Sequence, residues 1–98
     1  MNIDQLTEEM NRFVNSQGWY ESSSLRPQTP RNLAISLALE AAEVLEHFQW
    51  SDTIKDELSF SDELADVTLY ILQLASILNI DLEKAVLRKL ERNYQRKW

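Results

Sequence analysis

Residues 33–48 read LAISLALEAAEVLEHF, and residues 60–78 read FSDELADVTLYILQLASIL. In both stretches apolar residues recur at helical spacing, and neither stretch contains Gly or Pro, the residues that weaken a helix most. Thr29 and Pro30 stand before the first stretch and suit the N-cap and the first position of a helix. We therefore predict one helix from Thr29-Pro30 to near residues 50–51, and a second over the other stretch.

Two more helices and one long loop are expected around this pair. The second helix is expected to begin around residues 60–62 and to end at Leu78. Apolar spacing predicts a further helix over residues 3–17 and a last one that starts after Asp81, whose side chain suits an N-cap. Residues 19–30 are rich in Ser and hold both Pro residues, so they form the longest predicted loop.

The composition fits an all-helical protein. With one Gly and two Pro in 98 residues, long helices have few places to break. We predict an all-α, four-helix bundle-type fold in a single domain spanning residues 1–98. A domain of this size buries only a little over half of its unfolded surface, and without Cys no disulfide adds to its stability.

The helix over residues 60–78 predicts self-association. After Asp66 it has almost no polar face, and a helix that is apolar on nearly all sides is buried on nearly all sides. Four helices of one short chain offer too little surface to cover it. We therefore expect a homo-oligomer, either a homodimer or a homotetramer.

The charges are unevenly distributed. The net charge is −6, yet residues 84–98 hold six Lys and Arg residues against one Glu. The acidic remainder argues against binding a nucleic-acid polymer, which needs a broad basic surface. A basic end beside acidic residues fits an anionic ligand whose charge is shared between cationic side chains and a metal. Alternatively, these cations only complement the dipole of the last helix.

We expect no signal peptide at the start of this sequence. Asp4, Glu8 and Glu9 interrupt the first ten residues, where a signal peptide would need an apolar core. No apolar run reaches the ~18 residues that cross a membrane. The absence of Cys fits a reducing compartment. We expect a soluble, cytoplasmic protein that does not bind a membrane.

Two carboxylate pairs carry the clearest chemical signal. Glu40 and Glu43 are one helical turn apart, and Glu63 and Asp66 repeat that spacing on the next helix. Folding one helix back on the other makes the pairs face each other, and the repulsion between them favours a bound cation. Oxygen ligands without Cys favour Mg²⁺ or Mn²⁺ over Zn²⁺. We predict a metal site at these four residues.

Two other interpretations of the carboxylates remain open. Each pair can be the solvated face of an amphipathic helix, because such spacings are common. A di-iron bundle would also use carboxylates, but it needs a Glu-x-x-His motif on each of two helices. The one histidine, His47, lies four residues after Glu43 and fits a helix end better than a metal ligand.

Several short motifs occur in order over residues 19–96. They are TPRNL at 29–33, LEAAEVLEHFQW at 39–50, ELADV at 63–67 with Tyr70, IDL at 80–82, and Lys89 with Asn93. In these motifs the chain resembles the MazG-like nucleotide pyrophosphohydrolases of the all-α NTP pyrophosphatase superfamily, and most of all their compact, dCTP-pyrophosphatase-type branch. Leu39 stands where many MazG proteins have a further Glu, which matches that branch.

The resemblance implies an activity. Such enzymes use Mg²⁺ to hydrolyse nucleoside triphosphates between the α- and β-phosphates, giving a monophosphate and pyrophosphate, often as house-cleaning of the dNTP pool. Their metal ligands and catalytic carboxylates match Glu40, Glu43, Glu63 and Asp66, and which of the four acts as the base stays open. Relatives assemble as dimers or pairs of dimers with shared sites.

The resemblance also implies ligand-binding residues. Lys89 and Asn93 match the phosphate-side and sugar-side residues of the last helix, and Arg92 and Arg96 are weaker candidates. Lys89 can equally be an exposed helix lysine.

An aromatic cage for the base matches Trp50 and Tyr70, with Trp19 as a looser match. Stacking tolerates many bases, so the preferred base and sugar stay open. Without the resemblance, Tyr70 reads as a core residue and Trp50 as a packing anchor at a helix end.

A noncatalytic alternative belongs to another functional class. The same helices could form a regulatory or interaction module that binds a nucleotide without cleaving it. The presence of all four carboxylates together with Lys89 and Asn93 favours the enzyme, because a binding module does not need the complete set.

Overall fold

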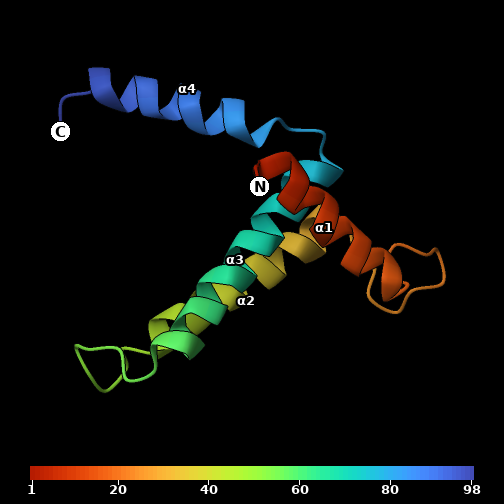
Figure 1. Cartoon of the computed structure of the whole chain (residues 1–98), viewed down its shortest axis with the longest axis horizontal. Coiled ribbons are helices and arrows are strands. Elements are labelled where there is room, and N and C mark those ends of the chain that lie inside the picture. Colours follow the sequence, from red (N-terminus) through yellow and green to blue (C-terminus); the bar gives the residue numbers. More distant parts are fainter.

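The structure, a computed structural model, describes all 98 residues and contains only helices, with no strand (Figure 1). The helices are α1 (Ile3–Ser16), α2 (Pro30–Glu46), α3 (Glu57–Ile77) and α4 (Leu82–Gln95). The predicted all-α class with four helices is confirmed.

Helix α2 begins where the sequence predicted, but it ends earlier. Thr29 is its N-cap, with Oγ1 accepting a hydrogen bond from the Asn32 amide at 3.2 Å, and Pro30 occupies the first turn. The helix stops at Glu46, so the predicted end near residues 50–51 is wrong. The Phe48 amide bonds to the Leu45 carbonyl three residues back, at 2.9 Å, so a tighter turn replaces the α-helical pattern.

Helix α3 begins a few residues before the predicted start because the N-cap is Asp56. Its Oδ1 accepts from the amides of Leu58 and Ser59 at 3.1 and 3.3 Å, and Oδ2 accepts from the Ser59 hydroxyl at 2.8 Å. These hydrogen bonds, first among them those from Ser59, lower the pKa of Asp56 below its ordinary value. The sequence alone does not distinguish Asp56 from the nearby acidic residues Asp52 and Glu57, and only the folded backbone shows which of them caps the helix.

Helices α2 and α3 form an antiparallel pair, and α1 packs across the later part of α3 (Figure 1). The packing of α1 on α3 buries Met10, Val14 and Leu72 in one small core, each no more than 4% exposed. Leu33, near the start of α2, is also buried. This arrangement places the two predicted carboxylate pairs on helices that lie side by side.

Helix α4 extends away from the other three (Figure 1). Asp81 caps it as predicted, with Oδ1 accepting from the Lys84 amide at 3.0 Å. The turn before it uses Asn79 at φ 55°, a left-handed conformation that Asn tolerates better than most residues. No residue of α4 is buried, and Val86 and Leu90 on its apolar stripe are each 48% exposed.

One chain by itself buries very little. Only six of the 98 residues are buried, and the one polar residue among them is Gln73. On α3, Leu69 and Ile71 remain 42% and 37% exposed, in line with the expectation that the helices of one chain cannot cover this helix. No single helix is long and apolar enough to span a membrane; α3 and α4 satisfy that criterion only together, as a pair bent by 106°.

Candidate active site

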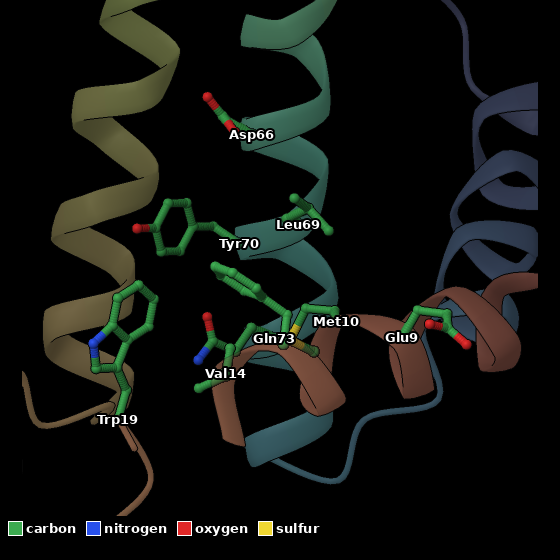
Figure 2. A pocket seen from close by; sticks show the side chains of 9 residues that line it. Glu9, Met10, Val14, Trp19, Asp66, Leu69, Tyr70 and Gln73 are labelled. Carbon is green, nitrogen blue, oxygen red and sulfur yellow. The ribbon is translucent and has the colours of Figure 1, made fainter. Parts of the chain in front are cut away.

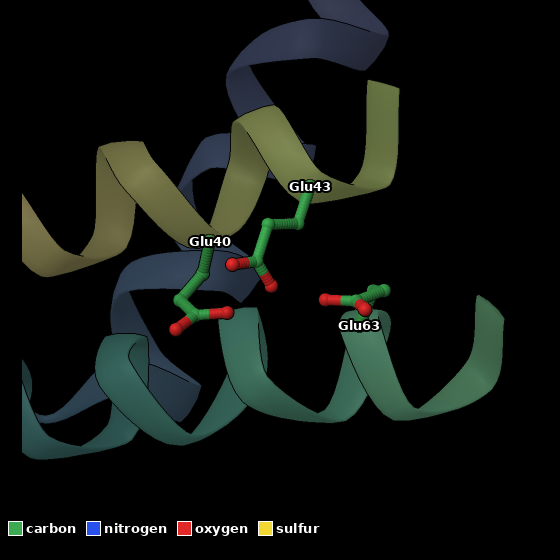
Figure 3. A group of neighbouring side chains, drawn as sticks. All are labelled: Glu40, Glu43 and Glu63. Atoms are coloured by element: carbon green, nitrogen blue, oxygen red, sulfur yellow. The ribbon is translucent and has the colours of Figure 1, made fainter. Parts of the chain in front are cut away.

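Three carboxylates meet between α2 and α3. Glu40 and Glu43 extend from α2 toward Glu63 of α3, and one carboxylate oxygen from each lies within 4.8 Å of the others (Figure 3). The spacing of three residues puts the two α2 side chains on one face, and the antiparallel packing brings Glu63 opposite them. The structure thus gathers three of the four predicted metal ligands.

The closeness of these groups makes their full ionisation unfavourable. The pKa of Glu40 is raised above its ordinary value, chiefly by burial and then by a hydrogen bond with Glu43 and the neighbouring negative charges. The pKa of Glu63 is raised as well, chiefly by a hydrogen bond with Glu43 and then by burial. His47 opposes that increase, since its Nε2 lies 3.8 Å from Glu63 Oε1.

The unpaired oxygens of this group suit a divalent cation. Oε2 of Glu40 and Oε2 of Glu63 are both buried and have no hydrogen-bond partner. An ionised carboxylate can only accept, so such oxygens are costly to bury without a donor or a cation. Three oxygen donors without sulfur favour a hard cation such as Mg²⁺ or Mn²⁺. The residues present therefore fit the metal that the sequence predicted.

Asp66 connects the carboxylate group to a neighbouring cavity. It lies one turn after Glu63 on α3, outside the group of three, and its negative charge helps to raise the pKa values of Glu40 and Glu63. Its side chain lines a cavity between α1 and α3 (Figure 2). A ligand in the cavity would therefore lie next to the carboxylates.

The cavity is mostly apolar and has a volume of about 300 Å³, at the small end of the range for small-molecule sites. Its lining residues are Glu9, Met10, Phe13, Val14, Trp19, Asp66, Leu69, Tyr70 and Gln73. The Trp19 and Tyr70 rings both border it (Figure 2), and Phe13 packs edge-to-face on Trp19 with ring centroids 5.7 Å apart. Two of the three aromatic residues predicted to hold a base thus share one cavity.

A comparison with known protein families identifies the family of this chain. The MazG-like family model matches residues 35–97, which include α3, α4 and the part of α2 that carries Glu40 and Glu43. This chain belongs to the MazG-like family.

Individual relatives agree with the family. The MazG-like chain is 40% identical over 76 residues to dCTP pyrophosphatase 1 of Mus musculus, and 34% identical over 76 residues to dCTP pyrophosphatase 1 of Homo sapiens. Each match covers 68% of this chain and 45% of the relative, so the chain spans less than half the length of these curated relatives. A pyrophosphatase from Archaeoglobus fulgidus superposes with a TM-score of 0.75 at 35% identity, covering 94% of this chain and 88% of that one.

Other predicted site residues of this MazG-like chain lie elsewhere. Lys89, Arg92 and Asn93 are on α4 and Arg96 is its C-cap. Helix α4 has no substantial packing contact with α2, so a single chain does not bring these residues to the carboxylates. Arg96 instead stacks on the Trp98 ring, 4.2 Å from its centroid.

Trp50 likewise lies outside the cavity. It follows α2 and is 87% exposed. Within one chain, only Trp19 and Tyr70 of the three predicted aromatic residues border the cavity.

The sequence prediction missed six of the nine residues that line the cavity, among them Met10, Phe13 and Gln73. Met10 and Phe13 belong to the apolar stripe of α1, and nothing in that periodicity separates a cavity wall from a core. Gln73 did leave a signal, because it is the single amide within the apolar run of α3. A polar side chain in such a run needs a partner, whether from the protein or from a ligand.

Proposed function

We propose that this MazG-like chain is a Mg²⁺-dependent pyrophosphohydrolase of nucleoside triphosphates. It cleaves between the α- and β-phosphates of a (deoxy)nucleotide and releases a monophosphate and pyrophosphate, as house-cleaning of the cytoplasmic dNTP pool. One observation carries the proposal: Glu40, Glu43 and Glu63 converge, with Oε2 of Glu40 and of Glu63 buried and unpartnered, and the neighbouring Asp66 lines an apolar cavity bordered by Trp19 and Tyr70.

The relatives support this activity. Those in mouse and human are named dCTP pyrophosphatase 1, and the Archaeoglobus protein of the same fold is named a pyrophosphatase. A deoxynucleoside triphosphate is therefore the substrate class we propose for this chain.

The chemistry follows from the carboxylates. Glu40, Glu43, Glu63 and Asp66 would hold the cation, which when bound neutralises triphosphate charge and lowers the pKa of water. A carboxylate oxygen left free by the cation accepts the proton of the attacking water. The water oxygen then forms a bond to one of the two phosphorus atoms that share the α,β-bridging oxygen. The bond from that phosphorus to the bridging oxygen breaks, which separates the monophosphate from pyrophosphate.

The cavity would hold the base. Trp19 and Tyr70 offer aromatic faces for stacking, and Asp66 lies between them and the carboxylates. With the base in the cavity, the triphosphate extends toward Glu40 and Glu63.

A second copy of the chain would complete the site. The apolar stripe of α4 is unpaired in one chain, with Val86 and Leu90 each 48% exposed, and Leu69 of α3 is 42% exposed. Pairing such faces between two copies would bury them, as in an obligate dimer. We propose that α4 of the partner brings Lys89 and Asn93, with Arg92 and Arg96, to the phosphates and sugar, and that Trp50 contributes in the same assembled homodimer or homotetramer.

A substrate panel tests the reaction. Ribo- and deoxyribonucleoside triphosphates are incubated with Mg²⁺, pyrophosphate and phosphate release are measured separately, and each reaction is repeated with EDTA. We expect pyrophosphate only when the metal is present. Release of phosphate instead would refute the reaction class, and no hydrolysis by a fully helical protein would favour the noncatalytic nucleotide-binding module.

A further inference from the structure

Gln73 is the only buried polar residue of the chain, with 3% of its surface exposed. It lies three residues after Tyr70 on α3, so both side chains are on the face that borders the cavity. A buried amide needs partners for two N–H donors and one carbonyl oxygen. The hydrogen bonds of Gln73 therefore decide what it offers to a ligand.

Both N–H donors of Gln73 are used inside the protein. Its Nε2 lies 2.7 Å from Oε1 of Gln28 and 3.4 Å from the hydroxyl oxygen of Tyr20. Its Oε1 accepts no hydrogen bond from the chain, because both hydrogen bonds of this amide are donated by Nε2. The carbonyl oxygen is thus the free polar atom of this side chain.

Gln28 fixes the orientation of the Gln73 amide. The Nε2 of Gln28 donates to the backbone carbonyl of Arg26 at 2.7 Å. Because a carbonyl oxygen can only accept, Gln28 must direct its Nε2 to Arg26 and its Oε1 to Gln73. Turning the Gln73 amide around would then place two carbonyl oxygens against each other.

Tyr20 makes a second, longer contact that favours the same orientation. Its hydroxyl donates to Oδ1 of Asn11 at 2.6 Å, and Nδ2 of Asn11 in turn donates to the Ser76 hydroxyl oxygen at 3.0 Å. With its one proton given to Asn11, the Tyr20 oxygen can only accept from Gln73. Two separate partners therefore hold the Nε2 of Gln73 away from the cavity.

The free oxygen of Gln73 faces the cavity. Figure 2 shows the amide of Gln73 beside Trp19, with its oxygen on the side of the Tyr70 ring. Six of the nine lining residues are hydrophobic, and the other two polar ones, Glu9 and Asp66, carry carboxylates. A ligand that stacks between the two rings therefore meets a fixed acceptor at its edge.

Resting on the proposed function, we propose that Gln73 selects the base by accepting a hydrogen bond from an exocyclic amino group. An amino-bearing base such as cytosine satisfies Oε1, whereas uracil places its own carbonyl oxygen at that position. Two facing acceptors without a proton are unfavourable in a water-poor site, and rejection of the wrong partner is how such a site gains specificity. Gln73 is thus a specificity-determining residue for the base.

The first experiment compares kcat/KM for dCTP and dUTP in the wild type and in Gln73→Met, which keeps the length and removes the amide. We expect the wild type to favour dCTP by about tenfold or more, and the variant to lose most of that preference. If Gln73 had a purely structural role, the variant would lower kcat/KM for dCTP and dUTP equally and leave their ratio unchanged. That result would overturn the proposal. Circular dichroism verifies that the variant folds.

A second variant leaves Gln73 in place. Gln28→Leu removes the acceptor that orients the amide, and Gln28 does not line this cavity. We expect the dCTP preference to fall here as well, because only the longer contact with Tyr20, at 3.4 Å, then opposes rotation of the Gln73 amide. A triphosphate of the cytosine analogue with hydrogen in place of the 4-amino group should be insensitive to Gln73→Met. Equal sensitivity of this analogue and dCTP would contradict the contact.

Binding of the products separates the two proposals. Calorimetry with dCMP and dUMP in Mg²⁺ requires no turnover. A preference for dCMP that Gln73→Met removes, in a protein that hydrolyses nothing, would retain the role of Gln73 and reject the enzyme. Hydrolysis with the same base ratio in wild type and variants would retain the enzyme and reject the role of Gln73.

Discussion

The Nε2 atom of His47 lies 3.8 Å from Oε1 of Glu63, which links the end of α2 to the early part of α3. Both side chains are mostly buried, at 19% and 22% exposure. A protonated His47 lowers the pKa of Glu63, whereas its contact with Glu43 raises it. Glu63 therefore has a carboxylate neighbour on one side and the one histidine of the chain on the other. Whether Glu63 is ionised changes the net charge of the three-carboxylate group.

Replacing Glu63 tests the metal site. We expect Glu63→Gln to lower kcat/KM at least about 100-fold, since even residues behind metal ligands commonly matter 10- to 100-fold. His47→Gln is the matched control, because His47 lies outside the group of three carboxylates, and we expect most activity to remain. Sizing and circular dichroism show whether both variants keep the wild-type assembly. Normal turnover by Glu63→Gln would show that the metal assignment is wrong.

The stability of the metal-free protein should fall with rising pH. The pKa values of Glu40 and Glu63 are raised in the folded state, so folding takes up protons between the ordinary and the raised values. This loss of folding stability is absent below the ordinary pKa of 4.5. It grows as pH rises from the ordinary to the raised pKa values and is constant above them. Thermal melts in EDTA from about pH 5 to about pH 8 measure it.

Adding Mg²⁺ should reverse that trend. The cation binds deprotonated carboxylates, so its stabilising effect grows as pH rises through the same window. Glu63→Gln should weaken both pH dependences because it removes one titrating group. A metal-free protein whose melting temperature rises steadily across this range would contradict the clustering of Glu40 and Glu63.

Mixing two inactive variants tests the shared site. Lys89→Ala disables the α4 side and Glu43→Gln disables the carboxylate side, so each alone should be nearly inactive. In mixed dimers one of the two sites has both residues intact, so random exchange should restore about a quarter of wild-type activity. The two proteins are unfolded and refolded together before the assay. Mixed dimers without any recovery would indicate that each site is formed by one chain.

A charge on the stripe of α4 should prevent assembly. Leu90 is 48% exposed in one chain, and burying an unpaired carboxylate there in an interface is costly. We expect Leu90→Asp to give monomers with little activity, measured by analytical ultracentrifugation and pyrophosphate release. Leu90→Met keeps the stripe apolar and should behave like the wild type. A fully assembled Leu90→Asp protein would place this stripe outside the interface.

Removing the Trp19 ring tests the base cavity. Aromatic stacking contributes about 1–3 kcal/mol per base, so Trp19→Leu should raise KM for the best triphosphate about tenfold or more. Trp19→Phe retains an aromatic face, so its KM should rise less than that of Trp19→Leu. Because Trp19 also packs against the small core with Phe13, urea unfolding of both variants separates lost stability from lost binding. An unchanged KM in Trp19→Leu would remove this ring from the binding site.

Local features of the fold followed from the sequence because their causes lie within a few residues. Thr29 and Asp81 cap helices through amides three residues later, and Glu40 and Glu43 share a helix face by spacing alone. The ends of the helices were harder to predict from the sequence. The end of α2 at Glu46 and the start of α3 after Asp56 depend on how the backbone turns between them, and several residues there had similar propensities.

The amino-acid sequence by itself determined the four helices, the caps of α2 and α4, the paired carboxylates and the membership in the family. Only the tertiary structure decided that Glu63 meets the α2 pair while Asp66 borders the cavity, that α4 leaves its stripe uncovered, and that the Gln73 amide is held by Gln28. Helical spacing is set by backbone hydrogen bonds within one turn, whereas these contacts join residues far apart in the chain and depend on the packing of whole helices.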